Sequence, residues 1–256
     1  TMPDSGSIII DGEALSPKHT AVIGYMPEER GLYKSMKVGE QALYLAQLKG
    51  LSKDEAKKRL KYWFDKFDIS AWWGKKIEEL SKGMAQKVQF IVTVMHNPKL
   101  LIFDEPFSGF DPINAQLIAK EILQLRDEGA TIIFSTHRME SVEEMCDEIA
   151  LIHKSNKILD GKLSDIKRQY RTNTFQVGLH TDHPKEVEAK LKESFEVFPA
   201  DFKLLGNELT LNVKLGENNS ANELLSFLTN RGQVQHFVEL IPSANDIFIQ
   251  AVNKNN

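Results

Sequence analysis

Two short segments of the chain carry residues suited to binding phosphate and a metal ion. At residues 100–105, four large apolar residues end in Asp104 and Glu105. A buried strand with this pattern releases its carboxylates at the C-terminal edge of a sheet, where open α/β folds hold their ligands. At residues 80–84, Leu-Ser-Lys-Gly-Met, a Ser and a Gly precede a helix-period pattern. The N-terminus of such a helix presents free backbone N–H groups, which attract phosphate.

A second apolar run, at residues 131–136, ends just before His137. Between the two runs, Asp111 and Pro112 predict the N-cap and first turn of a helix that Gly129 ends. Strand, helix, strand in this order is a βαβ crossover, so we expect the two strands to be parallel. Their C-terminal ends then bring the acids at the end of the first run and His137 to one crevice.

Together these segments resemble the ATP-binding subunits of ABC transporters. Residues 100–105 resemble the Walker B strand, residues 80–84 the signature loop, residues 108–111 the D-loop, and His137 the switch histidine, all in the family's order. The resemblance implies an α/β fold with a P-loop NTPase-like ABC ATPase core and a helical subdomain at about residues 36–95. It also implies ATP and Mg²⁺ as cofactors.

The resemblance assigns roles to the residues at the predicted crevice. Asp104 would hold the Mg²⁺ shell, Glu105 would polarise the attacking water, and His137 would bind the γ-phosphate. The alternatives are acids solvated at a strand end and a structural histidine. Asp111 would contact the second subunit, although its N-cap role alone explains its type.

In the signature loop, the resemblance assigns nucleotide binding to Ser81, Lys82 and Gly83, acting on ATP held by a second subunit. The sequence departs from the family's Leu-Ser-Gly-Gly-Gln because Lys82 replaces the first Gly and Met84 replaces Gln. The alternative is an ordinary helix start with Ser81 as N-cap.

Glu28 lies where the family usually has the glutamine of the Q-loop, so the resemblance assigns it to Mg²⁺ and nucleotide. A carboxylate offers only acceptors, whereas a glutamine also offers a donor, so we expect different coupling chemistry. The alternative is a charged surface loop.

The sequence contains no Gly-x-x-x-x-Gly-Lys-Ser/Thr stretch, the P-loop that cradles phosphates. The nearest imitation, at residues 161–164, lacks the upstream glycine. Residues 3–12 resemble the hairpin that follows the P-loop helix in the family. We therefore expect the chain to start just downstream of its own P-loop, and to be inactive as an ATPase by itself.

The composition sets limits on the class of partner. The 256 residues carry a net charge of −4, with 32 basic and 36 acidic residues, so no polybasic field indicates nucleic acid. The single cysteine, Cys146, excludes an internal disulfide. No signal pattern or apolar run near the ~20 residues of a membrane span occurs. A membrane role must therefore come through a partner.

We expect two domains: residues 1–171, the ATPase domain without its P-loop, and residues 172–256, a small α+β accessory domain of ferredoxin-like type. The predicted elements of the second domain are a strand at 175–179, a helix at 184–194, strands at 195–205 and 208–215, a helix at 221–230 and a strand at 234–240. Its tail at residues 241–248 resembles an extension on ABC ATPases that serve bacterial export systems.

Six aromatic residues precede the signature loop, and most are expected to pack in the helical subdomain. Exposed members would dock a helix of the membrane partner. The six are Tyr62, Trp63, Phe64, Phe67, Trp72 and Trp73.

The leading hypothesis is an ATP-hydrolysing subunit of an ABC transporter, of export type. It would pair with a second ATPase subunit, as a homodimer or heterodimer, and drive an integral membrane permease from the cytoplasmic face of the membrane. The rival is a non-catalytic interaction protein derived from such an ATPase. A soluble ABC-type ATPase of DNA repair or translation is a weaker third, because no long coiled coil or tandem cassette appears.

Overall fold

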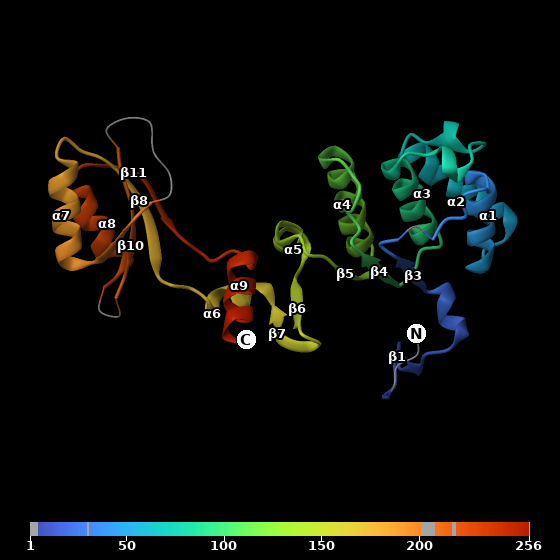
Figure 1. The fold of residues 1–256 in the computed structure, drawn as a ribbon, viewed down its shortest axis with the longest axis horizontal. Coiled ribbons are helices and arrows are strands. Elements are labelled where there is room, and N and C mark those ends of the chain that lie inside the picture. The colour runs from blue at the N-terminus through green and yellow to red at the C-terminus, as the bar shows by residue number, and fades with distance from the viewer. Residues whose placement is uncertain (1–4, 30, 201–207, 217–218, 256) are drawn as a thin grey trace. The chain divides into compact units, whose positions relative to one another are not determined.

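A computed structural model describes residues 5–29, 31–200, 208–216 and 219–255, and these form two compact units that divide between His137 and Arg138 (Figure 1). The units divide upstream of the predicted boundary between residues 171 and 172 because the last helix returns to pack on elements near residue 140. The predicted domain boundary itself stays a prediction.

The first unit is built on a parallel sheet with strand order β3–β4–β5. Parallel pairing of β4 and β5 confirms the expected crossover. A separate hairpin, β1–β2, precedes the sheet. The strands are β1 (Ile9–Ile10), β2 (Glu13–Ala14), β3 (Ile23–Met26), β4 (Leu100–Asp104) and β5 (Thr131–Ser135).

The two faces of this sheet differ in burial. Met26 and Phe103, paired across β3 and β4, are fully buried beneath the helices. On the opposite face, Tyr25, Ile102 and Ile133 form one row across the strands, and Tyr25 and Ile133 are 55% and 54% exposed. Parallel sheets are normally covered on both faces. This row is therefore an apolar surface that the described residues leave open.

The helical subdomain is present as predicted, with α1 and α2 packing on α3. Trp63, Phe64 and Phe67 are buried, whereas Tyr62 and Trp73 are exposed, so the predicted aromatic group is divided between core and surface. The helices of the first unit are η1 (Pro17–Ala21), α1 (Val38–Leu48), α2 (Lys53–Lys66), η2 (Ser70–Trp72), η3 (Ile77–Glu79), α3 (Lys82–Val94) and α4 (Pro112–Asp127).

The first part of the second unit consists of a hairpin and three helices. The last helix, α9, packs on α5 and on β7. It was not predicted from the sequence. The elements are α5 (Met139–Met145), β6 (Glu148–His153), β7 (Asn156–Lys162), α6 (Leu163–Gln169) and α9 (Ala244–Lys254).

The second part is the expected α+β fold. An antiparallel sheet with strand order β11–β8–β10–β9 has two helices, and the chain order β-α-β-β-α-β gives the ferredoxin-like topology. The predicted strand at 195–205 is observed as far as Pro199, and residues 201–207 lie outside the described residues. The elements are β8 (Thr174–His180), α7 (Pro184–Ser194), β9 (Glu196–Pro199), β10 (Glu208–Lys214), α8 (Ala221–Thr229) and β11 (Gln233–Glu239).

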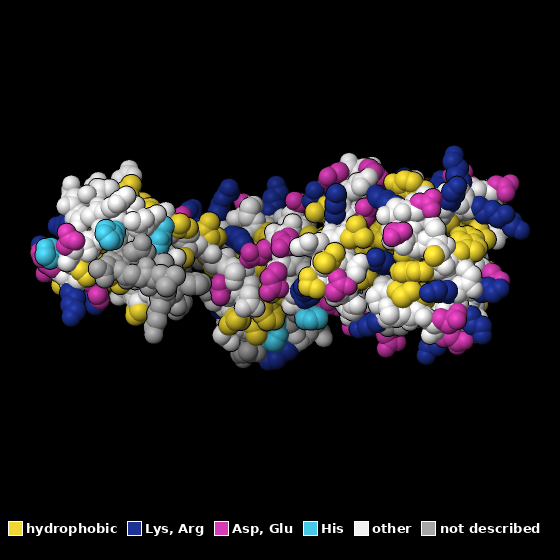
Figure 2. Space-filling view, turned by 90° about the horizontal axis from the view of Figure 1, so that it is seen from above, with side chains coloured by type: hydrophobic (Ala, Val, Ile, Leu, Met, Phe, Trp, Pro, Cys, Tyr) yellow, Lys and Arg dark blue, Asp and Glu magenta, His cyan; other side chains and the backbone are white. Residues whose placement is uncertain are grey.

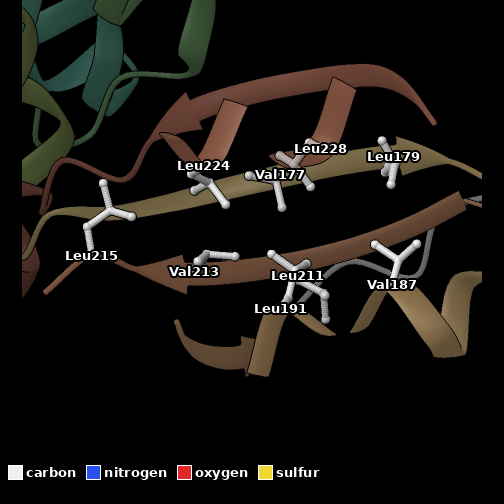
Figure 3. Close-up of a cluster of buried hydrophobic side chains, with 9 residues drawn as sticks. All are labelled: Val177, Leu179, Val187, Leu191, Leu211, Val213, Leu215, Leu224 and Leu228. Atoms are coloured by element: carbon white, nitrogen blue, oxygen red, sulfur yellow. The ribbon is translucent and has the colours of Figure 1, made fainter. Parts of the chain in front are cut away.

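Alternation along the strands explains the core of this domain. Val177 and Leu179 of β8 and Leu211 and Val213 of β10 point from one face of the sheet toward α7 and α8 (Figure 3). Leu191 of α7 is fully buried against them. The alternation along the strands and the helical spacing in α7 and α8 thus place their apolar side chains in one buried layer.

The surface carries charges of both signs. On the face shown in Figure 2, acidic and basic side chains are interspersed. Within the described ranges, no helix combines the length and apolarity needed to span a bilayer.

Glu143 holds the N-terminus of α9. Its Oε1 accepts a hydrogen bond from the Ala244 N–H and forms an ion pair with Lys167 Nζ at 3.0 Å. Burial favours the neutral form of this carboxyl, but the Ala244 N–H and the Lys167 ammonium outweigh it and hold the pKa of Glu143 below its ordinary value. The contact therefore ties α9 to α5 and α6 while Glu143 is ionised.

We expect Glu143→Gln to destabilise the second unit by about 1 kcal/mol, the size of a lost helix cap. Because the pKa of Glu143 is depressed in the folded protein, its contribution is complete above the unfolded pKa of about 4.3 and is lost as pH falls further. Urea unfolding at pH 7 and pH 3 checks this: the difference between wild type and variant should shrink at pH 3. Glu144→Gln, an exposed neighbour, is the control. An equal effect of both substitutions would contradict the role of Glu143.

Candidate functional site

The carboxyl ends of β4 and β5 bring Glu105 and His137 into contact. Glu105 Oε1 accepts a hydrogen bond from the His137 backbone N–H at 2.8 Å and lies 2.7 Å from His137 Nδ1. Thr136 Oγ1 donates to Glu105 Oε2 at 3.2 Å. The Glu105 side chain is 13% exposed, whereas that of His137 is 83% exposed. The carboxylate is thus fixed by the next strand while the imidazole faces solvent.

Asp104 is held in the same way one residue earlier. Asp104 pairs with Ser135 in the β4–β5 register, and the Ser135 hydroxyl donates to Asp104 Oδ1 at 2.5 Å. Glu105 follows with φ of 47°, a left-handed conformation that is uncommon for a side-chain-bearing residue. The backbone bends at this residue, so the two adjacent carboxylates do not simply alternate across the strand.

The predicted N-caps are both observed. Ser81 caps α3 through a hydrogen bond from the Met84 N–H to its Oγ at 3.3 Å. Asp111 caps α4, and its Oδ1 accepts from the Asn114 N–H at 3.0 Å. Hydrogen bonds from the Asn114 backbone and side-chain amide hold the pKa of Asp111 below its ordinary value. Asp111 is therefore an ionised cap at a helix start, and its predicted contact with a second subunit stays a prediction.

The signature and D-loop segments touch within this chain. Gly109 has φ of 84°, and a Cβ built there would lie 2.7 Å from Cδ of Lys82. The aliphatic part of Lys82 therefore lies directly over Gly109. Gly83, one residue further, would place a Cβ 3.6 Å from the Gly109 carbonyl oxygen. The position of Lys82, where the family has a glycine, thus depends on a glycine at the D-loop turn.

Glu28 is exposed in the segment that follows β3. Because Met26 pairs with Phe103 in the parallel register, this segment leaves the sheet at the edge where Asp104 and Glu105 lie. The Gln89 side chain donates to the Pro27 carbonyl oxygen at 2.8 Å, next to Glu28. The structure thus brings Glu28, Asp104, Glu105 and the histidine to one edge of the sheet.

The residues at this edge fit a magnesium ion. Mg²⁺ prefers oxygen ligands and is usually bound through one or two carboxylates together with phosphate oxygens and water. Asp104 offers a carboxylate that Ser135 orients from the neighbouring strand. In the described part of the chain, no set of three or more His, Cys, Asp and Glu side chains gathers into a metal site. Asp104 would therefore be one protein ligand among ligands supplied mainly by nucleotide and water.

Sequence reasoning missed the two hydroxyls at the end of β5. Ser135 and Thr136 directly precede His137, and each donates to one of the acids on β4. The available signal was the Ser-Thr pair at the end of an apolar run expected to lie beside the acidic strand. Only the register shows which hydroxyl meets which carboxylate.

Comparison with known proteins gives the class to which this fold and site belong. The profile of the family described as "ABC transporter" matches residues 1–108, and the profile "ATP-binding protein DrrA1-3-like, C-terminal domain" matches residues 161–252. A profile described as an AAA domain of a putative AbiEii toxin of a type IV toxin–antitoxin system matches residues 75–143.

Two ABC transporter ATP-binding proteins are similar to this chain along nearly its full length. It is 41% identical to the uncharacterized ABC transporter ATP-binding protein YhaQ of Bacillus subtilis, over 96% of this chain and 80% of YhaQ. It is 38% identical to an uncharacterized ABC transporter ATP-binding protein of Alkalihalophilus pseudofirmus, over 98% of this chain and 90% of that protein.

A solved structure titled "Structure of ATP binding subunit of ABC transporter" matches with a TM-score of 0.61 and 32% identity, over 66% of this chain and 71% of that one. The chain belongs to the family of ABC transporter ATP-binding proteins. The predicted family and fold class are confirmed. The roles assigned to individual site residues stay predictions.

We expect Gly109→Ala to destabilise the first unit and displace Lys82. The left-handed φ costs about 1 kcal/mol for alanine, and the contact with the Lys82 side chain adds to it. Gly129→Ala is the matched control, because Gly129 has φ of 105° with open space around its Cβ position. Thermal unfolding of both variants measures the difference. An effect of Gly109→Ala no larger than that of Gly129→Ala would contradict a close contact with Lys82.

Proposed function

We propose that this chain is the ATP-hydrolysing subunit of an ABC exporter and that two such subunits together power a membrane permease. The observation that supports this most strongly is the placement of Glu105 against His137 at the carboxyl edge of a parallel sheet, beside Asp104. Open α/β sheets bind their ligands at this edge. A carboxylate held by two donors, the Thr136 hydroxyl and the His137 N–H, next to an exposed imidazole, suits orientation of a water that attacks a phosphoryl group.

In this proposal each residue has one task. Glu105 accepts the proton of the attacking water, and the contacts from Thr136 and His137 keep its carboxylate in place. His137, exposed at its imidazole, contacts the γ-phosphate. When bound, Mg²⁺ would neutralise charge on the phosphates, with Asp104 and Glu28 as its protein ligands. The backbone amides at the N-terminus of α3, with Ser81 and Gly83, would bind the γ-phosphate held by a second subunit.

In this proposal, the phosphate cradle comes from a segment outside these 256 residues. No Gly-x-x-x-x-Gly-Lys-Ser/Thr stretch occurs in the 256 residues. Among the described residues, nothing covers Tyr25 and Ile133 of the apolar row, and β5 lies at the end of its sheet. Both features suit a strand and helix that pair with β5 and cover this row. We propose that a P-loop segment occupies this place in the active subunit, which acts as a dimer at the cytoplasmic face of the membrane.

A groove beside β3 is the place we propose for the permease. Residues from β3, α1 and α3 line a cavity of about 360 Å³, among them Tyr25, Leu45, Leu48 and Val92. Leu48 is 59% exposed at its rim. An apolar cavity with an exposed apolar rim suits one end of an amphipathic helix from a membrane partner. The export direction follows from the resemblance of the tail at residues 241–248 to an extension on ABC ATPases of bacterial export systems.

We predict that the chain by itself hydrolyses no ATP, and that fusing a strand, loop and helix with the Gly-x-x-x-x-Gly-Lys-Ser/Thr pattern ahead of Thr1 gives Mg²⁺-dependent hydrolysis. In that fusion protein, Glu105→Gln should lower kcat at least ~100-fold, because the general base is lost. Phosphate release measures both. Glu144→Gln, an exposed substitution in the second unit, is the control.

Hydrolysis by the unfused chain would contradict the requirement for a P-loop. A folded fusion protein that neither binds nor hydrolyses ATP would instead favour the rival function, a non-catalytic interaction protein. Binding without hydrolysis, unchanged by Glu105→Gln, would contradict the role of Glu105.

Leu48→Asp should reduce co-purification of the chain with its permease about tenfold or more, because a carboxylate at the rim opposes burial of an apolar helix. The matched control is Ile249→Asp on α9, which changes an apolar residue of similar exposure, 48%, far from the groove in sequence. Immunoprecipitation from detergent-solubilised membranes gives the measurement. Equal losses for both substitutions would argue against docking at this groove.

A further inference from the structure

We infer that Gln41 and Gln89, two buried glutamines of the helical subdomain, are positioning residues for Glu28. They hold the segment that carries Glu28 at its two ends, from α1 and from α3. This inference rests on the proposed function insofar as it concerns what Glu28 does, while the tether itself is a property of the folded chain.

The two glutamines bind the segment through different groups, Gln89 through its side-chain donor and Gln41 through its side-chain acceptor. Gln89 Nε2 donates to the Pro27 carbonyl oxygen at 2.8 Å, just before Glu28. Gln41 Oε1 accepts from the Tyr33 N–H at 3.1 Å, at the far end. Their exposures are 0% for Gln41 and 3% for Gln89. Hydrogen bonds in such buried settings are shielded from competing water, so each bond restrains the backbone it holds.

The sheet restrains Glu28 less directly. The pairing of β3 with β4 ends at Met26 and Phe103. For the described residues between Met26 and Tyr33, the hydrogen bond from Gln89 is the one that reaches another element. The position of Glu28 relative to Asp104 therefore depends on α1 and α3, and a shift of the helical subdomain would move Glu28 with it.

The chemistry of glutamine explains why this residue type serves at both ends. A glutamine side chain supplies a donor and an acceptor without charge. In the described part of the structure, the second group of each tether, Gln41 Nε2 and Gln89 Oε1, is buried without a hydrogen-bond partner. An unpaired buried polar group is costly. An apolar residue would avoid that cost, so packing alone does not explain a glutamine at either place.

The cavity beside β3 links the tether to the proposed permease groove. Pro27 and Gln89, the two partners of one tether, both line it, together with Leu32. A side chain that enters the cavity therefore contacts the tether itself. Docking at this groove would change the restraint on Glu28 through that one hydrogen bond.

Hydrogen exchange of the chain as it stands tests the tether. Gln41→Met and Gln89→Met should each raise amide exchange in the segment 28–33 at least fivefold, because one end is released. Gln41→Glu should retain slow exchange of the Tyr33 N–H, since a carboxyl oxygen still accepts. Gln86→Met is the matched control: Gln86 is a 1% exposed glutamine of the same helix that does not line the cavity. Thermal unfolding identifies any variant that fails to fold.

The link to Glu28 is tested by a double-mutant cycle in the fusion protein that carries the added P-loop segment. Gln89→Met should raise the half-saturating Mg²⁺ concentration at least threefold when Glu28 is present. It should have no further effect in a Glu28→Ala background, because coupled residues are not additive. A purely structural role of Gln89 would lower stability and leave the Mg²⁺ dependence unchanged.

The outcomes separate this inference from the proposed function. Exchange in segment 28–33 that is equal in all three methionine variants would overturn the tether, whatever the fusion protein does. Additive effects in the cycle would overturn the link to Glu28. A fusion protein without ATPase activity, combined with the expected exchange pattern, would instead contradict the proposed function and leave the tether supported.

Discussion

The candidate site depends on one constraint, the parallel register between β4 and β5. Asp104 faces Ser135 across the two strands, so the next residues of each strand, Glu105 and Thr136, meet just beyond the sheet. A slip of one residue would turn every side chain of β5 to the other face and would separate His137 from Glu105. The buried row on the other face, including the fully buried Phe103, specifies the register. The packing of the core and the geometry of the site are thus set by the same strand pairing.

Local signals were sufficient for much of this arrangement. The apolar run before Asp104 predicted the strand, and the helix starts at Ser81 and Asp111 followed from their residue types and spacing. The contacts of Ser135 and Thr136 with the acids could not be predicted in this way. They depend on the register between β4 and β5, two strands that are distant in the sequence. The tethers from Gln41 and Gln89 were missed because a glutamine in a helical pattern carries no local sign of its partner, which lies 8 residues away for Gln41 and 62 for Gln89.

The final helix, α9, was missed for a different reason. Ser243 and Asp246 form a capping box at the start of α9, a signal that the sequence displays before Ile247. Sequence reasoning treated this tail as a family resemblance and assigned it no element. The structure shows that α9 packs on α5, the helix that begins two residues after His137, and that Glu143 holds its first turn. The C-terminal helix is therefore anchored to α5, the first helix of its own unit.

We propose that the acids of one subunit and the Ser81–Gly83 loop of a second subunit enclose one ATP. The most direct measurement is the mass of the P-loop fusion protein carrying Glu105→Gln, determined by light scattering with and without ATP and Mg²⁺. We expect a monomer without nucleotide and a dimer with ATP, and the dimer should be lost when Ser81→Arg places a bulky side chain at the interface. A protein that binds ATP and stays monomeric, or a dimer that Ser81→Arg leaves intact, would contradict it.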